Sequence, residues 1–208
     1  VGAGKSTLVR LLAGRLRAEG RRVGESFEPV ERWAGQLEGF YKGTVSASQL
    51  QDQIRRARYA QFAAALDAAV RPPGAGPVVV LGERPPLISD HLFWRMQKMD
   101  NAERAAQRAA DSEERVKIAR LFALRGIRVR ATIVHLQRPV ADCVGRIRER
   151  GRHGEVRPDG TCAIDQGYLD TLDRAHREWL PEALGLFPGA ARLVHVEAAI
   201  AAQPYEDN

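Results

Sequence analysis

The first residues of the chain, VGAGKST, have the types and spacing of a phosphate-binding loop. They match the end of the pattern G-x-x-x-x-G-K-[ST], whose last three positions are Gly4, Lys5 and Ser6. Glycines let the backbone bend so that successive N–H groups point at phosphate oxygens, and the following helix adds its positive end. We expect Lys5 to reach the β- and γ-phosphates and the Ser6 hydroxyl to ligate Mg²⁺. The candidate ATP-binding residues are Gly2, Ala3, Gly4, Lys5, Ser6 and Thr7.

The loop pattern also predicts what should precede Val1. Its first glycine, and the strand that feeds a P-loop, would lie ahead of that residue, so we expect the chain to be a fragment cut within the motif. A glycine-rich turn without a nucleotide is the alternative, but the apolar helical pattern LVRLLAGRL that follows favours a P-loop. The motif alone indicates nucleotide binding and leaves the reaction open.

A second candidate site follows the apolar run in VVVLGER, where Glu83 and Arg84 come directly after a predicted strand. Ligands collect at the carboxyl ends of parallel strands, and a P-loop enzyme places a second Mg²⁺-organising acid there. Glu83 is therefore the candidate metal-organising carboxylate, and Arg84 can pair with phosphate. The alternative, an ion pair at the surface end of a strand, is the weaker interpretation in a chain that also carries a P-loop.

A third candidate site lies in FEPVERW, where Glu28 ends a predicted strand and Pro29 stiffens the backbone after it. A carboxylate at this place can take the proton of an attacking hydroxyl, which is the general-base role in phosphoryl transfer. Trp33 could line a pocket for a flat ring. The alternative is a glutamate at a helix N-terminus followed by a tryptophan in the core.

Strands and helices alternate along the chain. Strands are predicted at residues 23–27, 78–81, 131–136 and 193–196, the second and third as apolar runs buried on both faces. Helices are predicted at residues 6–19, around Trp33 and Leu37, and at 47–70, 89–110, 112–124, 140–150 and 164–184, with loops at 71–77 and 152–161. This alternation predicts a single α/β domain over residues 1–208, with a doubly wound parallel sheet and helices on both faces.

Composition narrows the class of protein. The chain has 208 residues, of which 44% are hydrophobic and 28% charged, as in a soluble globular domain. No apolar run reaches the roughly 20 residues of a membrane span, so we expect no membrane partner. The net charge of +6 and pI of about 9.8 could suit nucleic acid, but basic groups equally suit a site for polyanionic nucleotides, and we expect no nucleic-acid partner. Cys143 and Cys162 lack metal-ligand spacing and indicate a reducing compartment, which favours the cytoplasm and leaves organelle targeting open.

These motifs together resemble the deoxyribonucleoside kinases, a family that includes the herpesviral thymidine kinases. The shared order is a P-loop, then E-P-V-x-x-W, then E-R at a strand end, then an arginine-rich lid. The segment RIRERGRHGE, Arg146 to Glu155, resembles the family's R-I-R-x-R-x-R-x-x-E, and the helix ending in HREWL resembles the helix after the lid. The resemblance covers Val1 to about Val196 and implies a P-loop kinase fold.

The resemblance implies a role for each matching residue at the reacting end. Glu28 would be the general base on the sugar 5′-hydroxyl, and Arg84 would steady that end of the substrate. Arg150 and Arg152 would clamp the transferring phosphoryl group. The implied reaction is transfer of the ATP γ-phosphoryl to a deoxynucleoside 5′-hydroxyl, with Mg²⁺ held by Ser6 and organised by Glu83. A homodimer is also implied.

The resemblance assigns the nucleoside to a second group of residues. Glu155 would bind the sugar 3′-hydroxyl, and Tyr41 would share that task. Gln51 would hydrogen-bond the base edge, because its amide offers a donor and an acceptor together, with Trp33 packed beside it. Two neighbouring glutamines are alternatives to Gln51: Gln49 and Gln53.

Arg58 and Asp90 bear on the choice of base. Arg58 lies seven residues after Gln51, two helical turns on, so both can face one pocket. The resemblance to the deoxycytidine kinases extends to this arginine and to Asp90, which is displaced by one residue; such a pair could serve an exocyclic amino group. This favours deoxycytidine or purine deoxynucleosides, with thymidine as the alternative. The opposing interpretation puts Arg58 on a solvated helix face with Arg55 and Arg56.

Two departures from the family pattern affect the substrate range. Pro85 and Pro86 follow Glu83-Arg84, which is nearer the viral, thymidine kinase-like D-R-H-P pattern than the cellular one, and the lid has extra residues at 157–161. A nucleoside monophosphate kinase or other small-metabolite P-loop kinase is the alternative enzyme, but it would need a basic site for the acceptor's phosphate. A P-loop switch ATPase is the alternative from another class, and the lid arginines count against it.

Overall fold

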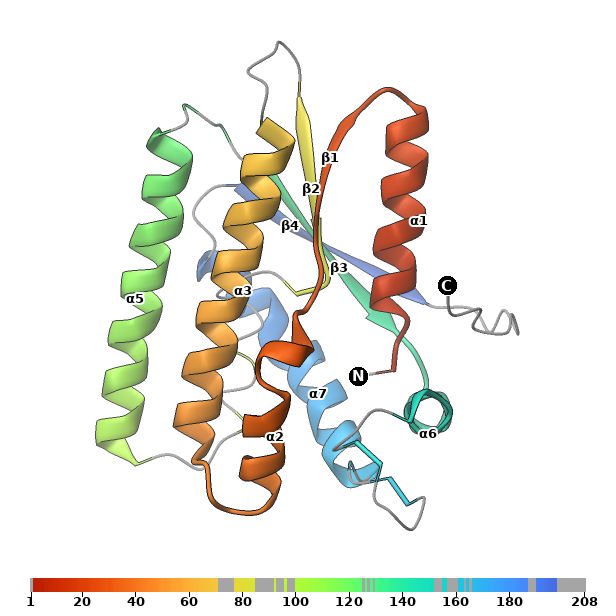
Figure 1. Cartoon of the computed structure of the whole chain (residues 1–208), viewed down its shortest axis with the longest axis vertical. Helices are drawn as coiled ribbons and strands as arrows, with labels where there is room; N and C mark the ends of the chain where they lie inside the picture. The colour runs from red at the N-terminus through yellow and green to blue at the C-terminus, as the bar shows by residue number, and fades with distance from the viewer. Residues whose placement is uncertain are drawn as a thin grey trace.

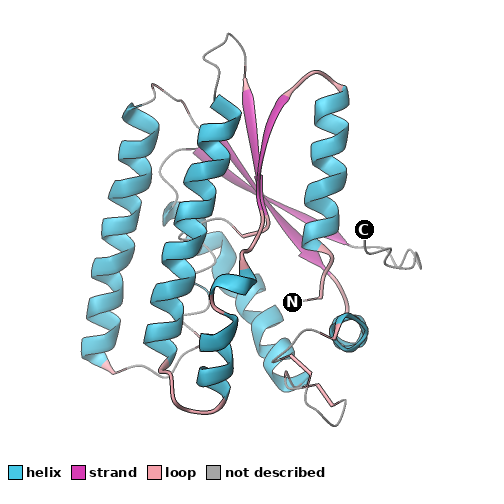
Figure 2. Ribbon diagram, in the orientation of Figure 1, coloured by secondary structure: helices cyan, strands magenta, loops and turns pink. Residues whose placement is uncertain are grey.

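The computed structural model describes residues 2–70, 77–84, 92, 96, 100–124, 126, 128, 130–151, 155–156, 161–162, 164, 166–186 and 190–197. Its helices and strands alternate as an α/β fold (Figures 1 and 2). In chain order they are α1 (Lys5–Ala18), β1 (Arg22–Ser26), η1 (Val30–Arg32), α2 (Ala34–Tyr41), α3 (Ala47–Val70), β2 (Val78–Gly82), α5 (Asn101–Leu124), β3 (Arg130–Gln137), α6 (Val140–Arg150), α7 (Gln166–Ala183), η2 (Leu184–Leu186) and β4 (Ala190–Glu197). None of the described helices is both long and apolar enough to cross a membrane.

The described strands form two parallel pairs. β1 pairs with β2 from Arg22↔Val78 to Ser26↔Gly82, and β3 pairs with β4 from Arg130↔Ala190 to Gln137↔Glu197. Parallel strands joined through helices confirm the predicted α/β class. Within the described residues, however, β2 and β3 are not hydrogen-bonded to each other, so the strands do not make the single doubly wound sheet that we predicted.

The main hydrophobic core joins α3, α5 and α7. Leu66 of α3, Ile118 and Phe122 of α5 and Leu180 of α7 are buried in one cluster with Leu92. Figure 1 shows α5 beside α3 on one side of the strands and α1 on the other. The β1–β2 pair touches α3 very closely, because a Cβ on Gly24 would lie 2.3 Å from the carbonyl oxygen of Ala65. Only glycine permits this approach of strand to helix.

Helix α5 corrects a prediction. The sequence suggested a helix at 89–110 and another at 112–124, whereas residues Asn101–Leu124 form one continuous helix. Its start is fixed by a reciprocal capping box: the Glu103 N–H donates to Asp100 Oδ1 over 2.8 Å, and the Asp100 N–H donates to Glu103 Oε2 over 3.0 Å. Asp111 and Ser112 are weak helix formers but carry no backbone constraint, so they do not interrupt it.

The burial predicted for α1, β2 and β3 is only partly observed. The leucines that give α1 its apolar helical spacing, Leu8, Leu11, Leu12 and Leu16, do not form its buried face. Val9 and Ala13 are buried instead, and Leu11 is 67% exposed. Residues Val78–Leu81 are only half-buried, and Val134 of β3 is 41% exposed. Leu8 and Leu12 of α1, Val78–Leu81 and Val134 line one cavity between the two strand pairs.

Two predicted loops fall mainly outside the described residues. The first is 71–77, of which only Pro77 is described, and the second is the lid loop 152–161. Val156, inside the second loop, and Cys162, just after it, form an antiparallel bridge.

Candidate active site

The P-loop has the backbone geometry that its glycines predict. Gly2 and Gly4 have φ of 72° and 91°, in the left-handed region that favours glycine, and Gly4 caps α1 without any side-chain hydrogen bond. A Cβ on Gly2 would lie 2.7 Å from the carbonyl oxygen of Cys143, so α6 packs directly against the loop. The N–H groups of the first turn of α1 are therefore not capped by a side chain, which is the arrangement of an anion site at a helix N-terminus. Thr7, also a candidate, is exposed at the start of this helix.

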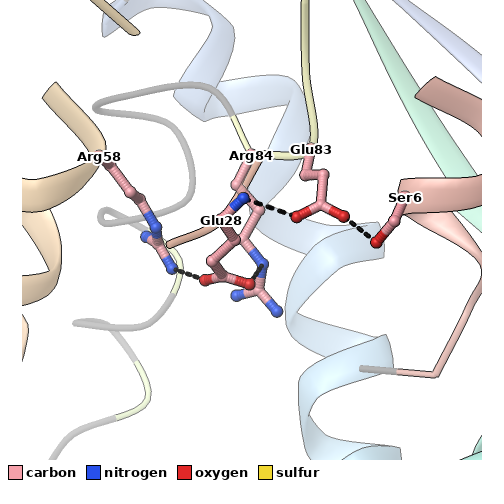
Figure 3. Close-up of polar contacts among 5 residues, drawn as sticks. All are labelled: Ser6, Glu28, Arg58, Glu83 and Arg84. Atoms are coloured by element: carbon pink, nitrogen blue, oxygen red, sulfur yellow. Dashed lines mark hydrogen bonds and ion pairs between the residues drawn. The ribbon is translucent and has the colours of Figure 1, made fainter. Parts of the chain in front are cut away.

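Glu83 links the P-loop to the end of β1. The Ser6 hydroxyl donates a hydrogen bond to Glu83 Oε1, and the Glu28 N–H donates to Glu83 Oε2 over 2.8 Å (Figure 3). The Glu83 N–H in turn donates to the carbonyl oxygen of Ser26 over 3.1 Å, which continues the pairing of β1 with β2. The Glu83 carboxylate thus fixes the position of the predicted nucleotide-binding loop relative to Glu28, the predicted general base.

Glu28 sits between two arginines. Arg58 Nη2 lies 2.6 Å from Glu28 Oε1 and Arg84 Nε lies 3.3 Å from Oε2 (Figure 3). All three side chains are largely buried, with 14%, 5% and 13% of Glu28, Arg58 and Arg84 exposed. Burial raises the pKa of Glu28, but Arg84 and Arg58 outweigh it and lower the pKa to about 2. Glu28 is therefore ionised at neutral pH and held in a fixed orientation.

The charges of Glu28, Glu83 and Arg84 also act on Lys5. Burial and Arg84 lower the pKa of Lys5 to about 8, although Glu28 and Glu83 act in the opposite direction. Arg150 also lowers this pKa, which places the end of α6 within electrostatic reach of the P-loop lysine. A polyphosphate bound at the loop would raise the pKa of Lys5 again and further stabilise its charged form.

Helix α6 brings arginines to the loop. Arg150, in its last turn, forms an ion pair with Glu155, and Gly151 ends the helix with φ of 59°. Four residues earlier, Arg146 Nη1 lies 3.2 Å from the position that a Cβ on Gly4 would take. Arg146 was not among the predicted site residues, although its i, i+4 spacing from Arg150 places both on one face of the helix. That spacing is the signal that could have identified it.

Helix α3 turns Gln51 and Arg58 inward. Both residues are buried, so Arg58 is not part of a solvated arginine face; that description fits Arg56, whose side chain is 77% exposed. Gln51 Oε1 is buried without a hydrogen-bond partner among the described residues. The two rival glutamines are engaged elsewhere: Gln49 caps α3 through Ser46, and Gln53 Nε2 donates to the carbonyl oxygen of Arg32 over 3.1 Å. Gln51 is thus the glutamine with a free acceptor at the predicted position.

Trp33 takes the structural role that we had considered as the alternative. It is 4% exposed and packs in a cluster with Leu50, Ile54 and Ala57 of α3. This cluster fixes the segment after Glu28 against the helix that carries Gln51 and Arg58. The tryptophan therefore positions the candidate site, whatever contact it makes with a ligand.

Three predicted site residues are not placed. Asp90 and Arg152 lie outside the described residues, and Tyr41 is the last residue of α2, with its side chain outside them. Glu155 is buried and engaged with Arg150.

The described residues contain no cluster of three or more His, Cys, Asp or Glu side chains that could hold a metal ion alone. Mg²⁺ does not need one, because it binds through one or two protein oxygens and otherwise through water and substrate phosphates. Ser6 Oγ and the Glu83 carboxylate are already in contact and offer two oxygen donors beside the P-loop. The residues present therefore fit a magnesium ion that arrives with a nucleotide.

The comparison with protein families agrees with this geometry. A family model described as deoxynucleoside kinase matches residues 1–201 of the chain. No individually curated protein matches it significantly. Because the match spans nearly all of the 208 residues, it includes the P-loop, the Glu28 segment, the Glu83-Arg84 segment and helix α6. The chain belongs to the deoxynucleoside kinase family.

Proposed function

We propose that the protein transfers the γ-phosphoryl group of ATP, with Mg²⁺, to the 5′-hydroxyl of a deoxynucleoside. The observation that carries the proposal is the linked set Ser6–Glu83–Glu28, flanked by Arg58 and Arg84. In this set the loop proposed to bind ATP, the phosphoryl donor, meets the carboxylate proposed to act on the nucleoside, the phosphoryl acceptor. Positioning of this kind is the main contribution that a protein makes to phosphoryl transfer.

Glu28 acts on the acceptor. Its carboxylate, ionised at neutral pH, accepts a hydrogen bond from the 5′-hydroxyl and takes the proton as the bond to phosphorus forms. A pKa of about 2 makes Glu28 a weak base. In a loose, largely dissociative transition state the hydroxyl loses its proton late, so orientation matters more than basicity.

The residues around the ATP phosphates neutralise negative charge in this proposal. Lys5 and the N-terminus of α1 bind the β- and γ-phosphates, while Arg150 and Arg146 of α6 approach the same space and oppose the charge that spreads over the transferred group. Ser6 and Glu83 would hold Mg²⁺, which neutralises the β- and γ-phosphate oxygens when bound. Arg152, the next residue of the family's lid pattern, completes this cationic surface in the proposal.

The nucleoside lies against α3 in this proposal. The unpartnered Gln51 Oε1 accepts a hydrogen bond from the base edge, and its amide nitrogen can donate. An exocyclic amino group or the ring N3–H of thymine can satisfy that acceptor, so Gln51 alone does not choose the base. The proposed preference for deoxycytidine and purine deoxynucleosides over thymidine rests on Arg58 and Asp90. Glu155 and Tyr41 are proposed for the sugar 3′-hydroxyl.

The alternatives predict different products from one experiment. The protein is incubated with γ-labelled ATP, Mg²⁺ and each of the four natural deoxynucleosides or their monophosphates. Label in a nucleoside monophosphate supports the proposal. Label only in free phosphate would support a switch ATPase, and label only in a diphosphate would support a monophosphate kinase; either outcome would overturn the proposal.

A further inference from the structure

Two histidines lie side by side on the second strand pair. His135 of β3 and His195 of β4 are partners in the parallel register, so their side chains leave the same face of the pair. Their Nδ1 atoms are 3.2 Å apart, and their rings meet edge to face at 66°. Helix α7 packs on this face through His176, whose ring stacks on that of His135 with the centroids 5.6 Å apart. One nitrogen of each imidazole therefore points at a shared position near the carboxyl ends of both strands.

The next two residues on this face add oxygen donors. Side chains alternate along a strand, so Gln137 and Glu197, which are also register partners, share the face of the histidines. The Gln137 side-chain amide lies 3.5 Å from His195 Nδ1, and rotation of the amide presents Oε1 in place of Nε2. Glu197 is exposed and is not clustered with the histidines as described, so a rotamer change is needed to bring its carboxylate to the same position.

The spacing of the donor atoms is that of ligands around one metal ion. Zinc–nitrogen bonds of about 2.0–2.1 Å at the tetrahedral angle hold two ligand atoms about 3.3 Å apart. The separations of 3.2 Å between the histidines and 3.5 Å between His195 and Gln137 lie on either side of that value. Imidazole suits Zn²⁺, Ni²⁺ and Cu²⁺, whereas Mg²⁺ prefers oxygen ligands, so this group differs in chemistry from Ser6 and Glu83.

The protonation of the histidines also suits a metal ligand. Burial and the neighbouring His195 lower the pKa of His135, while Asp173 acts in the opposite direction and Arg177 adds to the lowering. Burial lowers the pKa of His176 to about 4, so the ring stacked on His135 brings no positive charge at neutral pH. A hydrogen bond between two Nδ1 atoms needs a proton on one of them. A metal ion replaces that bond once the donor ring carries its proton on Nε2 instead.

We propose that His135, His195 and Gln137 bind a divalent transition-metal ion of the zinc type, with Glu197 or water as the fourth ligand. The ion takes no part in the proposed phosphoryl transfer. It links β3 to β4 near their carboxyl ends, and it stabilises the folded chain because only folding brings these donors together.

The test uses the 208-residue chain, prepared without a histidine tag, and Co²⁺ as a coloured probe in the absence of nucleotide. Co²⁺ in a four-coordinate imidazole site absorbs visible light far more strongly than hydrated Co²⁺. We expect this absorption to saturate at one Co²⁺ per chain. An equal amount of Zn²⁺ should abolish it, and roughly a hundredfold excess of Mg²⁺ should not.

Three variants locate the ion. His195→Ala should weaken Co²⁺ binding by roughly 100-fold or more, because loss of even an outer partner of a metal ligand costs about 10–100-fold, and Gln137→Leu should weaken it by about tenfold. Val194→Thr is the matched control, because Val194 is exposed beside His195 on the opposite face of the strand, and it should leave binding unchanged. Zn²⁺ should raise the Tm of the wild type and of Val194→Thr but not that of His195→Ala.

The opposite results would overturn the proposal. Unchanged Co²⁺ binding in a folded His195→Ala variant, checked by circular dichroism, would put the ion on other side chains. If that variant does not fold, unchanged binding in Gln137→Leu has the same meaning. Displacement of Co²⁺ by Mg²⁺ would put the ion on oxygen ligands such as Ser6 and Glu83, and saturation only at millimolar Co²⁺ would show that no ordered site exists.

Discussion

Glu28 is the residue on which the proposed chemistry depends most. It is held by Arg58 and Arg84 through its side chain and by Glu83 through its N–H. We predict that Glu28→Gln lowers kcat by about 10²–10⁴, the usual cost of losing a general base, with little change in ATP affinity. Steady-state kinetics and a nucleotide-binding titration measure both quantities. Glu25→Gln is the matched control, because Glu25 lies on β1, three residues before Glu28, and pairs with Arg17 at 2.5 Å. An unchanged kcat in Glu28→Gln would assign Glu28 to structure alone.

The ion pairs of Glu28 also predict a pH dependence of stability. Its pKa is lowered from 4.5 to about 2, so the folded state binds fewer protons than the unfolded state between those values. The stabilisation is complete above about pH 5 and is lost as the pH falls toward 2, with a magnitude of about 3 kcal/mol. Urea unfolding of wild type and Glu28→Gln should show a difference in unfolding free energy that shrinks from about pH 6 to pH 3. A difference independent of pH would contradict this assignment.

Arg58 connects Glu28, the proposed general base, to the part of the site proposed to bind the nucleoside. It lies two turns after Gln51 on α3 and contacts Glu28, so Arg58→Met should lower kcat/KM for every nucleoside and also change their order. The ranking of the four deoxynucleosides by kcat/KM is the informative measurement. Loss of the contact with Glu28 alone would lower kcat/KM for all of them together and leave the ranking unchanged. Arg56→Met, at an exposed position of the same helix, is the control. A wild type that already prefers thymidine, or an order unchanged by Arg58→Met, would refute the proposed base preference.

At the scale of elements, helix α6 connects its C-terminal arginines to the P-loop. Its start packs on Gly2, and Arg150 of its last turn pairs with Glu155 and contributes to lowering the pKa of Lys5. Arg150→Lys keeps the charge but loses the planar fork, so kcat should fall by more than KM for the nucleoside rises. Arg148→Lys, on the exposed side of the same helix, should have little effect. Equal losses in the two variants would mark the arginines as a solvated helix end.

The helices were the most predictable part of the fold. The limits of α3 and α6 follow from apolar spacing and agree with the structure at Ala47–Val70 and Val140–Arg150. The capping box at Asp100 and Glu103 could have located the start of α5, but the alanine-rich sequence around it carries no strong period. The burial of β2 and β3 was overestimated. An apolar run indicates that a strand can be buried on both faces, but it does not show how closely other elements pack on it.

The composition of the candidate site was more predictable than its contacts. Motif spacing predicted Ser6, Glu28, Glu83 and Arg84 individually as site residues, and the structure brings them together, because strand ends of a parallel sheet meet at one edge. It did not identify Arg58 as the partner of Glu28, since the two residues are 30 positions apart and their contact depends on how α3 packs on β1. Sequence spacing within one helix cannot provide that information.

At the scale of the whole molecule, the partly buried apolar side chains of the two strand pairs bear on solubility. The apolar surfaces of β2, β3 and α1 that border the cavity of about 840 Å³ between the strand pairs are only partly buried, so we predict that the chain is poorly soluble. Thermal unfolding of this chain in solution provides the measurement. A cooperative melt of a chain that stays in solution would contradict this expectation.

The central claim is that the molecule positions a nucleoside 5′-hydroxyl for attack on ATP. The most direct measurement supplies γ-labelled ATP with 2′-deoxycytidine or with 2′,5′-dideoxycytidine, which lacks only the acceptor hydroxyl. We predict labelled 5′-monophosphate from the first and no labelled nucleotide from the second, with label transfer reduced by about 10²–10⁴ in Glu28→Gln. Release of label as free phosphate at the same rate with both compounds would contradict the account.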